Sequence, residues 1–595
     1  LQLSASGRVK NVMNPKNLFY DLNIKNFSTS SKTIYNLIPK NTIPNNIRIP
    51  SKLSVKGKAK GTTEIINTQL AINSTLGNAK IDAILDMQKK DAEKYNVKAD
   101  LQNLDIGTLI SNKDLGKITG KINAIGTSFN PEKMVTKLSG TVSSAYYNNY
   151  TYQNIALDAK VNHGAFDAHV FSKDPNANLN LTASGVYKKD LSDVKLNGNI
   201  VKLDVQKLGF YNEPMIVAGE IDANFADLNP DNLNGSLYLK NFALSNTKDI
   251  FPMQEVSLIA TSTADSNQIN LTSQLADLDM KGKFKLTQIF GSLTSTINQY
   301  YEFQKPNKDE KIEPHQFFTL NAKIKDDELI RRFVPDLKSF ETITLDATYD
   351  ADSKQLNVDG KIPNLTYGTN TINNGVLKLS NQNEALLYSL NVDALKSESF
   401  QLQKIDLNGD ITNNVINYNV STKDAKDATQ FLVAGNLKKL NDITEISLNP
   451  NGLVLNYDQW QVGEGNLIQL RKDGIVAHNF SLMNNGSQIL LQSESEKGTS
   501  PLNITIKDFK IETIAEIIKK DDLPAEGTIN GTAQIRDLNK EMTFNADLTV
   551  SDLKAFGNPI GNIIAKVKNT SPTTINADIT LDGNSNNMKI FGDYN

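Results

Sequence analysis

The chain has 595 residues, a net charge of −3 and no cysteine. Its length exceeds one ordinary hydrophobic core, so it forms either several domains or an elongated repeat array. The lack of a basic excess argues against a nucleic-acid partner, and the lack of cysteine excludes disulfides and thiolate zinc sites.

The start of the chain already has the pattern of a β-strand. The residues Leu1–Gly7 alternate in polarity, and no initiator methionine precedes them. No run of about 18 apolar residues occurs, so the sequence predicts no membrane-spanning helix. We therefore expect a segment of a longer protein, with any membrane anchor outside this segment.

Alternation with a period of two dominates the chain. In 544–551 and 575–582, every second residue is apolar and the others are polar, which predicts strands with one apolar and one polar face. Clusters of Asn, Asp, Gly and Ser, such as 582–587, predict turns between the strands. At a spacing of about 11 residues, the chain would supply about 50 strands.

A larger unit recurs along the chain. It consists of a strand, a short helical turn, a loop that often holds proline, and a strand with a central glycine, as in 97–109 followed by 118–124. Units of this kind begin near residues 20, 97, 196, 318 and 502. Such self-similarity indicates modules that bury their faces on one another, and the central glycines suit a bent or coiled sheet.

Three segments interrupt the strand pattern. Residues 38–50 hold three prolines and predict an irregular loop. Residues 284–301 have apolar side chains mostly three or four apart, which predicts an amphipathic helix that either gates a groove or, as we favour, covers local core or a sheet edge. Residues 302–314 include a charged stretch, 304–311, and predict a solvated linker.

A sheet with one apolar face must cover that face. The predicted helices are too few, so the alternatives are β-sandwiches in series or one long curled antiparallel sheet whose apolar side lines a groove. We predict the second: an all-β, taco-like β-groove repeat array with a few short helices, continuous over 1–595. The groove candidates are the inward members of alternating strands, namely Ile118, Ile122, Val217, Ile221, Phe544, Leu548, Ile575 and Ile579.

No motif for catalysis or cofactor binding appears. The sequence lacks a nucleophile elbow, a P-loop and a dinucleotide fingerprint, so we expect no enzyme activity and no cofactor. The four histidines are His163, His169, His315 and His478. None has the spacing of a metal site, although His163 and His169 would share one face of a straight strand. The single tryptophan, Trp460, could stack on a ligand, but we expect it to anchor the core of its strand.

The repeated strand, short helix and glycine-containing strand resemble the TamB and AsmA-like proteins of Gram-negative bacteria. A second stretch, 454–491, resembles the pattern of TamB-like proteins of Bacteroidota, which the abundance of Asn and Lys also suits. The resemblance extends over nearly the whole chain and rests on pattern and repeat.

This resemblance implies a periplasmic β body with an inner-membrane anchor outside the segment. It also implies a phospholipid cargo and an outer-membrane partner of the BamA superfamily, of the TamA or TamL type. The implied function is a lipid-transfer bridge in outer-membrane biogenesis. Three alternatives remain open: a scaffold for assembly of the outer-membrane barrel proteins that the resemblance implies, an adhesin of serial β-sandwiches and, as the weakest, a polysaccharide-active β-helix enzyme.

Overall fold

The computed structural model describes residues 1–595 except 15–16, 38–42, 45, 187–192, 247, 304–311, 383, 399, 516–524, 537–541, 572, 584, 586 and 595. Most of the predicted 302–314 linker and part of the 38–50 loop therefore lie outside the described residues. Strands make up 68% of the structure and helices 7%. The strands form antiparallel sheets of 31 and 9 strands, neither closed into a barrel, which confirms the predicted all-β fold.

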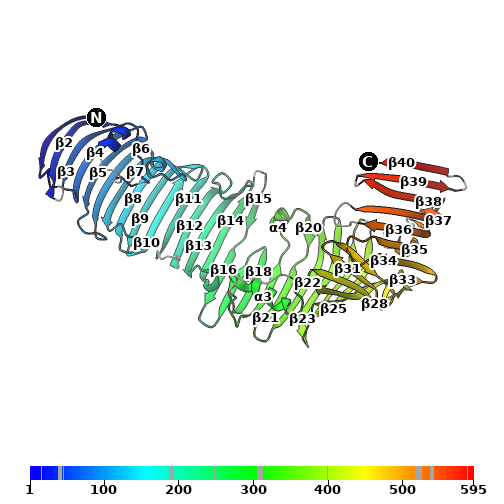
Figure 1. The fold of residues 1–595 in the computed structure, drawn as a ribbon. Helices are drawn as coiled ribbons and strands as arrows, with labels where there is room; N and C mark the ends of the chain where they lie inside the picture. Colours follow the sequence, from blue (N-terminus) through cyan, green and yellow to red (C-terminus); the bar gives the residue numbers. More distant parts are fainter. Residues whose placement is uncertain are drawn as a thin grey trace. The chain divides into compact units, whose positions relative to one another are not determined.

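The chain divides into two units, Leu1–Gln274 and Leu275–Asn595. In unit 1 the strands follow one another largely in chain order, from blue to green in Figure 1. Its elements are β1 (Gln2–Lys10), β2 (Phe19–Thr29), α1 (Ser31–Leu37), β3 (Leu53–Gly61), β4 (Ile65–Ser74), β5 (Gly77–Asp86), β6 (Lys94–Asp105), α2 (Ile106–Ile110), β7 (Leu115–Thr127), β8 (Val135–Tyr147), β9 (Tyr150–Asn162), β10 (Ala165–Lys173), β11 (Ala177–Val186), β12 (Asp193–Asp204), β13 (Ile216–Asp227), η2 (Pro230–Asn232), β14 (Asn234–Ser245), β15 (Ile250–Met253), β16 (Val256–Ser262) and β17 (Asn267–Thr272).

Unit 2 contains the remaining elements. The first part comprises β18 (Ala276–Lys283), η3 (Leu286–Gln288), α3 (Ile289–Asn298), β19 (Phe317–Ile324), α4 (Glu328–Phe333), β20 (Leu337–Phe340), β21 (Ile343–Asp350), β22 (Gln355–Tyr367), β23 (Asn370–Gln382), β24 (Ala385–Lys396), β25 (Gln401–Thr412), β26 (Val415–Lys423), β27 (Thr429–Leu440), β28 (Ile443–Leu455), β29 (Asp458–Gln459), β31 (Leu467–Arg471) and β32 (Gly474–His478). The smaller sheet holds β30 (Gln461–Val462), β33 (Phe480–Asn484), β34 (Ser487–Ser493), β35 (Leu502–Lys510), β36 (Glu526–Arg536), β37 (Thr543–Ala555), β38 (Asn558–Ser571), β39 (Thr574–Asp582) and β40 (Asn587–Tyr594), with α5 (Glu512–Ala515) after β35.

The described residues form 40 strands, fewer than the sequence estimate. Strands are longer than the estimate assumed: β7 has 13 residues and β38 has 14. Within the predicted helix 284–301, the structure has the short turn η3 followed by α3.

The recurring unit of the sequence has a specific structural basis. In four of the units, the first strand contains a bulge, and the residue just before that bulge stands opposite the central glycine of the next strand. The pairs are Ile24 with Gly57, Leu101 with Gly120, Ile200 with Gly219, and Ile506 with Gly531. Because a bulge adds a residue to one strand only, it increases the local twist.

The strand with the central glycine lies between the bulged strand and a third strand, and it is the third strand that requires glycine. A Cβ atom at Gly57 would lie 1.9 Å from the carbonyl oxygen of Gln69 on the following strand, and one at Gly531 would lie 2.1 Å from that of Asp547. No side chain fits at such a distance, so glycine permits the close approach of the third strand. The central glycines therefore mark places where the sheet twists sharply.

Candidate functional site

The register of unit 1 aligns apolar residues across the strands. Directly opposed residues of antiparallel strands project to the same face, so successive register pairs trace a row of side chains on one face. One such row, here named the Ile122 row, crosses β1 to β14 and β16. It consists of Ala5, Ile24, Gly57, Leu70, Ile81, Ala99, Ile122, Gly140, Leu157, Val170, Leu181, Gly198, Ile221, Leu239 and Val256.

No polar side chain interrupts the Ile122 row, and its Ile, Leu and Val side chains are all half-buried. A second apolar row runs two residues further along the strands and includes Ala83, Leu138 and Leu271. These rows make one broad apolar face in unit 1.

The residues between these two rows belong to the other face and are polar. They form a row of Ser6, Asn23, Lys58, Gln69, Asp82, Lys98, Asn123, Ser139, Asp158, His169, Thr182, Asn197, Asp222, Tyr238, Ser257 and Thr272. Along each strand, an apolar residue of one face is adjacent to a polar residue of the other. This contrast shows that the strands keep one pairing register across the unit, because a slip of one residue would exchange the two faces.

The smaller sheet of unit 2 has the same organisation. A row named the Leu548 row crosses all nine of its strands. It consists of Val462, Leu482, Ile489, Ile506, Gly531, Leu548, Ala565, Ile579 and Ile590. The opposite face carries Asp547, Lys566 and Asp578 in register, with Lys566 Nζ 3.6 Å from an Asp547 carboxylate oxygen.

The larger sheet contributes a second apolar row in unit 2, the Leu379 row. Its members are Met280, Leu320, Ala347, Val358, Leu379, Tyr388, Gly409, Tyr418, Gly435 and Leu448. Sequence reasoning did not single out the two tyrosines. A Cβ at Gly409 would lie 2.7 Å from the Tyr388 hydroxyl oxygen, so the tyrosine covers the neighbouring glycine, and burial raises the pKa of both tyrosines. The signal in the sequence that could have found them is a strand with a tyrosine followed directly by a strand with a central glycine.

The structure brings several of the eight sequence candidates together. Ile122 and Ile221 share the Ile122 row, and Leu548 and Ile579 share the Leu548 row. The other four stand outside these two rows. Ile118 and Val217 lie near one strand end, opposite Leu104 and Leu203; Phe544 lies opposite Ile535, and Ile575, 40% exposed, lies opposite Tyr594.

Helix α3 covers one end of the apolar face in unit 2. Its Ser292 and Thr296 are buried, and the Tyr349 hydroxyl lies 3.0 Å from the Thr296 hydroxyl and donates to the Ser292 carbonyl at 3.1 Å. The Phe318 ring lies 5.3 Å from that of Tyr349, and burial raises the pKa of Tyr349. The helix therefore covers local core, in line with the favoured interpretation.

Trp460 lies in a core between the two sheets of unit 2. Its side chain is 2% exposed and clusters with Leu453 of the larger sheet and with Val462 and Phe509 of the smaller one. The Trp460 and Phe509 rings are 5.9 Å apart. Trp460 thus anchors hydrophobic core, and the Leu548 row begins in this core because Val462 belongs to both.

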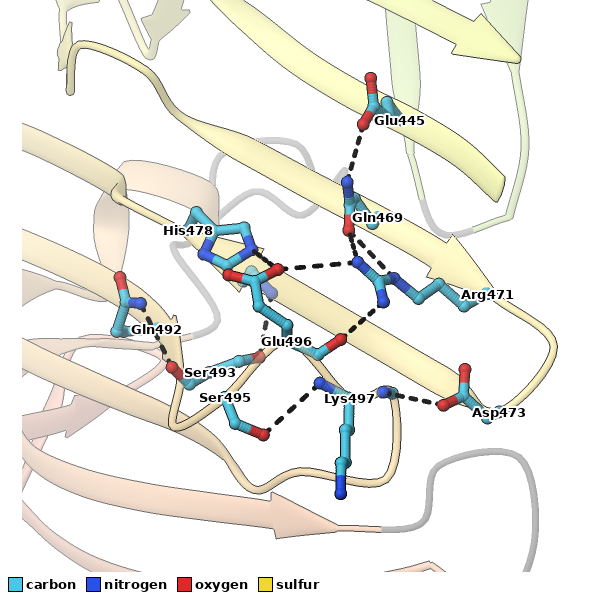
Figure 2. Close-up of polar contacts among 12 residues, drawn as sticks. Glu445, Gln469, Arg471, Asp473, His478, Gln492, Ser493, Ser495, Glu496 and Lys497 are labelled. Carbon is cyan, nitrogen blue, oxygen red and sulfur yellow. Dashed lines mark hydrogen bonds and ion pairs between the residues drawn. The ribbon is translucent and has the colours of Figure 1, made fainter. Parts of the chain in front are cut away.

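A polar cluster fastens the loop between β34 and β35 to the β31–β32 hairpin (Figure 2). Arg471 Nη1 donates to the Glu496 carbonyl at 2.6 Å, and His478 Nε2 lies 3.2 Å from a Glu496 carboxylate oxygen. The Gln469 side chain accepts from Arg471 and donates to Glu445 at 2.7 Å. Each member is paired with a neighbouring strand or loop, so the cluster holds the fold together.

The four histidines have separate partners. His163 lies in the β9–β10 turn, so it does not share a strand face with His169 of β10. His169 contacts Asn180 at 2.6 Å, and His315 contacts Asp352 at 2.8 Å. Within the described ranges, no group of three or more His, Asp or Glu residues could hold a metal ion.

No helix in the described part of the chain is both long and apolar enough to span a bilayer. No protein-family model matches the chain, and no curated protein matches it.

Proposed function

We propose that this chain conducts phospholipid along its apolar face, as the body of a bridge between the inner and outer membranes. The observation that carries the proposal is the uninterrupted Ile122 row. Contiguous apolar surface larger than a few hundred Å² on a soluble domain marks a binding surface for lipid, ligand or protein. The row has no polar residue along it, and its half-buried Ile, Leu and Val side chains offer an acyl chain apolar contacts across the unit, with glycine on three of the strands.

The geometry of the Ile122 row favours movement of phospholipid along the row over binding of phospholipid at one fixed position. Neighbouring strands lie about 4.8 Å apart, so a chain can pass from one side chain of the row to the next without crossing a polar group. In unit 2 the Leu548 row is likewise free of polar side chains, whereas the Leu379 row includes Tyr388 and Tyr418. The continuity of the 31-stranded sheet supports this function over an adhesin of serial β-sandwiches.

The location and the partner in this proposal come from the resemblance to TamB and AsmA-like proteins. The chain would lie in the periplasm, anchored in the inner membrane by a segment outside it, and would deliver lipid to an outer-membrane barrel of the BamA superfamily. Fractionation of the native cell envelope and co-purification with such a barrel test these two points.

Site-specific photo-crosslinking tests the lipid path. A crosslinking residue is placed at Ile122, Ile221 or Leu548, and at the matched polar-face neighbours Asn123 and Asp222. We expect phospholipid adducts at the first three positions and none at the neighbours. The further candidates Ile118, Val217, Phe544, Ile575 and Ile579 are compared with Asn545 and Asp578 in the same way.

Two results would contradict the proposal. Equal labelling of both faces would show that the apolar rows have no selective contact with lipid. Adducts to unfolded barrel proteins, without lipid, would instead indicate the scaffold function in barrel assembly.

A further inference from the structure

The polar face of unit 1 contains a cavity with an apolar floor. The cavity has a volume of about 900 Å³ and lies at one end of β4 to β9. Its lining includes Ile65, Ile84, Ile125 and Val135, which are 38%, 49%, 54% and 39% exposed. Ile84 and Ile125 both stand opposite Asn96, and Ile84 follows Asp82 of the polar row by two residues, so they project to the polar face.

Single exposed aliphatic side chains are common on protein surfaces. Here four branched aliphatic residues lie close together on β4, β5, β7 and β8. Elsewhere the same face carries Asn, Asp, Lys and Ser. The volume falls within the range of about 300–1,000 Å³ that is typical of small-molecule sites.

Three lysines surround this floor. Lys94, Lys137 and Lys160 line the cavity and are exposed, and Asp86 is the acidic residue of the lining. Lys137 and Lys160 stand directly opposite each other on β8 and β9. Like charges in that arrangement destabilise a sheet. Among the described residues no ion pair neutralises either ammonium group, although Asp167 of β10 faces Lys160.

The geometry points to a binding site for an anionic amphiphile: a molecule with an aliphatic chain and a carboxylate or phosphate group. The chain lies on the four aliphatic side chains. The anionic group lies between Lys137 and Lys160, where it relieves their repulsion and forms charge-assisted hydrogen bonds. This site is on the face opposite the Ile122 row, so it does not rest on the proposed function.

The absence of cysteine makes a direct binding assay possible. The variant Asn96→Cys carries an environment-sensitive fluorophore inside the cavity, and Asn197→Cys carries it on the polar face elsewhere. The full chain is titrated with laurate, dodecyl phosphate and uncharged dodecanol. We expect a saturable change at position 96 with at least one of the two anions, weaker binding of dodecanol by at least tenfold, and no saturable change at position 197.

Two sets of variants locate the contacts. Ile84→Asp, and the pair Lys137→Glu with Lys160→Glu, should each weaken binding at least tenfold. The matched controls Ile259→Asp and Lys195→Glu, which change exposed polar-face residues elsewhere, should leave it unchanged. Circular dichroism verifies that the sheet persists.

The two anions identify the head group. Preference for laurate or for dodecyl phosphate assigns a carboxylate or a phosphate, and both results support the site. Equal binding of dodecanol, or unchanged binding in the lysine pair variant, would overturn it. Crosslinking of phospholipid at Ile122 reports on the opposite face, so failure of one proposal is distinguishable from failure of the other.

Discussion

Ile506 of β35 stands directly opposite Gly531 of β36, at the last register pair before the bulge in β35. The same pair belongs to the Leu548 row. The glycine that permits the twist of the sheet is therefore also a member of its apolar row, so twist and apolar continuity depend on the same position.

Gly531→Val should destabilise the smaller sheet by about 3 kcal/mol, because the new Cβ would meet the Asp547 carbonyl oxygen at 2.1 Å and φ is +142°. Gly592→Val is a matched control, since its φ is +141° and no atom lies within 4 Å of the new Cβ. Urea unfolding of both variants measures the difference. Equal destabilisation would mean that the close strand approach is unimportant.

Leu157→Asp should reduce transfer of fluorescent phospholipid between vesicles at least tenfold. The substitution places a carboxylate in the middle of the Ile122 row, and contact of such a group with acyl chains costs about 3 kcal/mol. Asp158→Asn, on the polar face beside it, should leave transfer unchanged. Normal transfer by Leu157→Asp would show that lipid does not pass along this row.

Trp460→Ala should lower the free energy of unfolding by about 3–5 kcal/mol, since a large buried ring would leave a cavity between the two sheets. Trp460→Phe should cost less because it keeps part of the contact with Phe509. Chemical denaturation monitored by circular dichroism tests both. A loss below 1 kcal/mol for the alanine variant would contradict the assigned core.

Tyr150 should make stability fall at alkaline pH. The pKa of its phenol is raised to about 12, and burial is the largest cause. The second cause is the hydrogen bond to buried Asp174 at 2.7 Å. The unfolded phenol has a pKa near 10. Its contribution is therefore fully present below pH 10 and is lost as the pH rises toward about 12, because the unfolded state releases its proton first.

The comparison that isolates this effect is Tyr150→Phe. The difference in stability between wild type and variant, from denaturant titrations at several pH values, should be constant below pH 10 and should shrink above it. A difference that stays constant to pH 12 would contradict the raised pKa.

Arg471→Ala should loosen the loop between β34 and β35. It removes the hydrogen bond to the Glu496 carbonyl, and the local opening free energy should fall by about 1 kcal/mol. Hydrogen exchange at the Gly498 amide, which donates to Asp473 at 3.0 Å, reports the change. Lys472→Ala, next to it, removes an exposed ion pair with Asp442 and should leave this amide unchanged.

The sequence by itself determined the class of fold and the chemistry of each strand face. Alternation of period two is a local property, so residues such as Phe544–Val550 specify a strand with two unlike faces whatever its neighbours are. The central glycines also indicate, from the sequence alone, positions where the backbone conformation is unusual.

Only the tertiary structure decided which strand faces join into continuous surfaces. Ile122 and Ile221 have five strands between them, β8 to β12, and whether they align depends on the register of each pair. Register follows from bulges, turns and cross-strand contacts that act between distant residues. The same reason explains why the cavity near Ile84 could not be found in the sequence, since its aliphatic residues and lysines come from six strands.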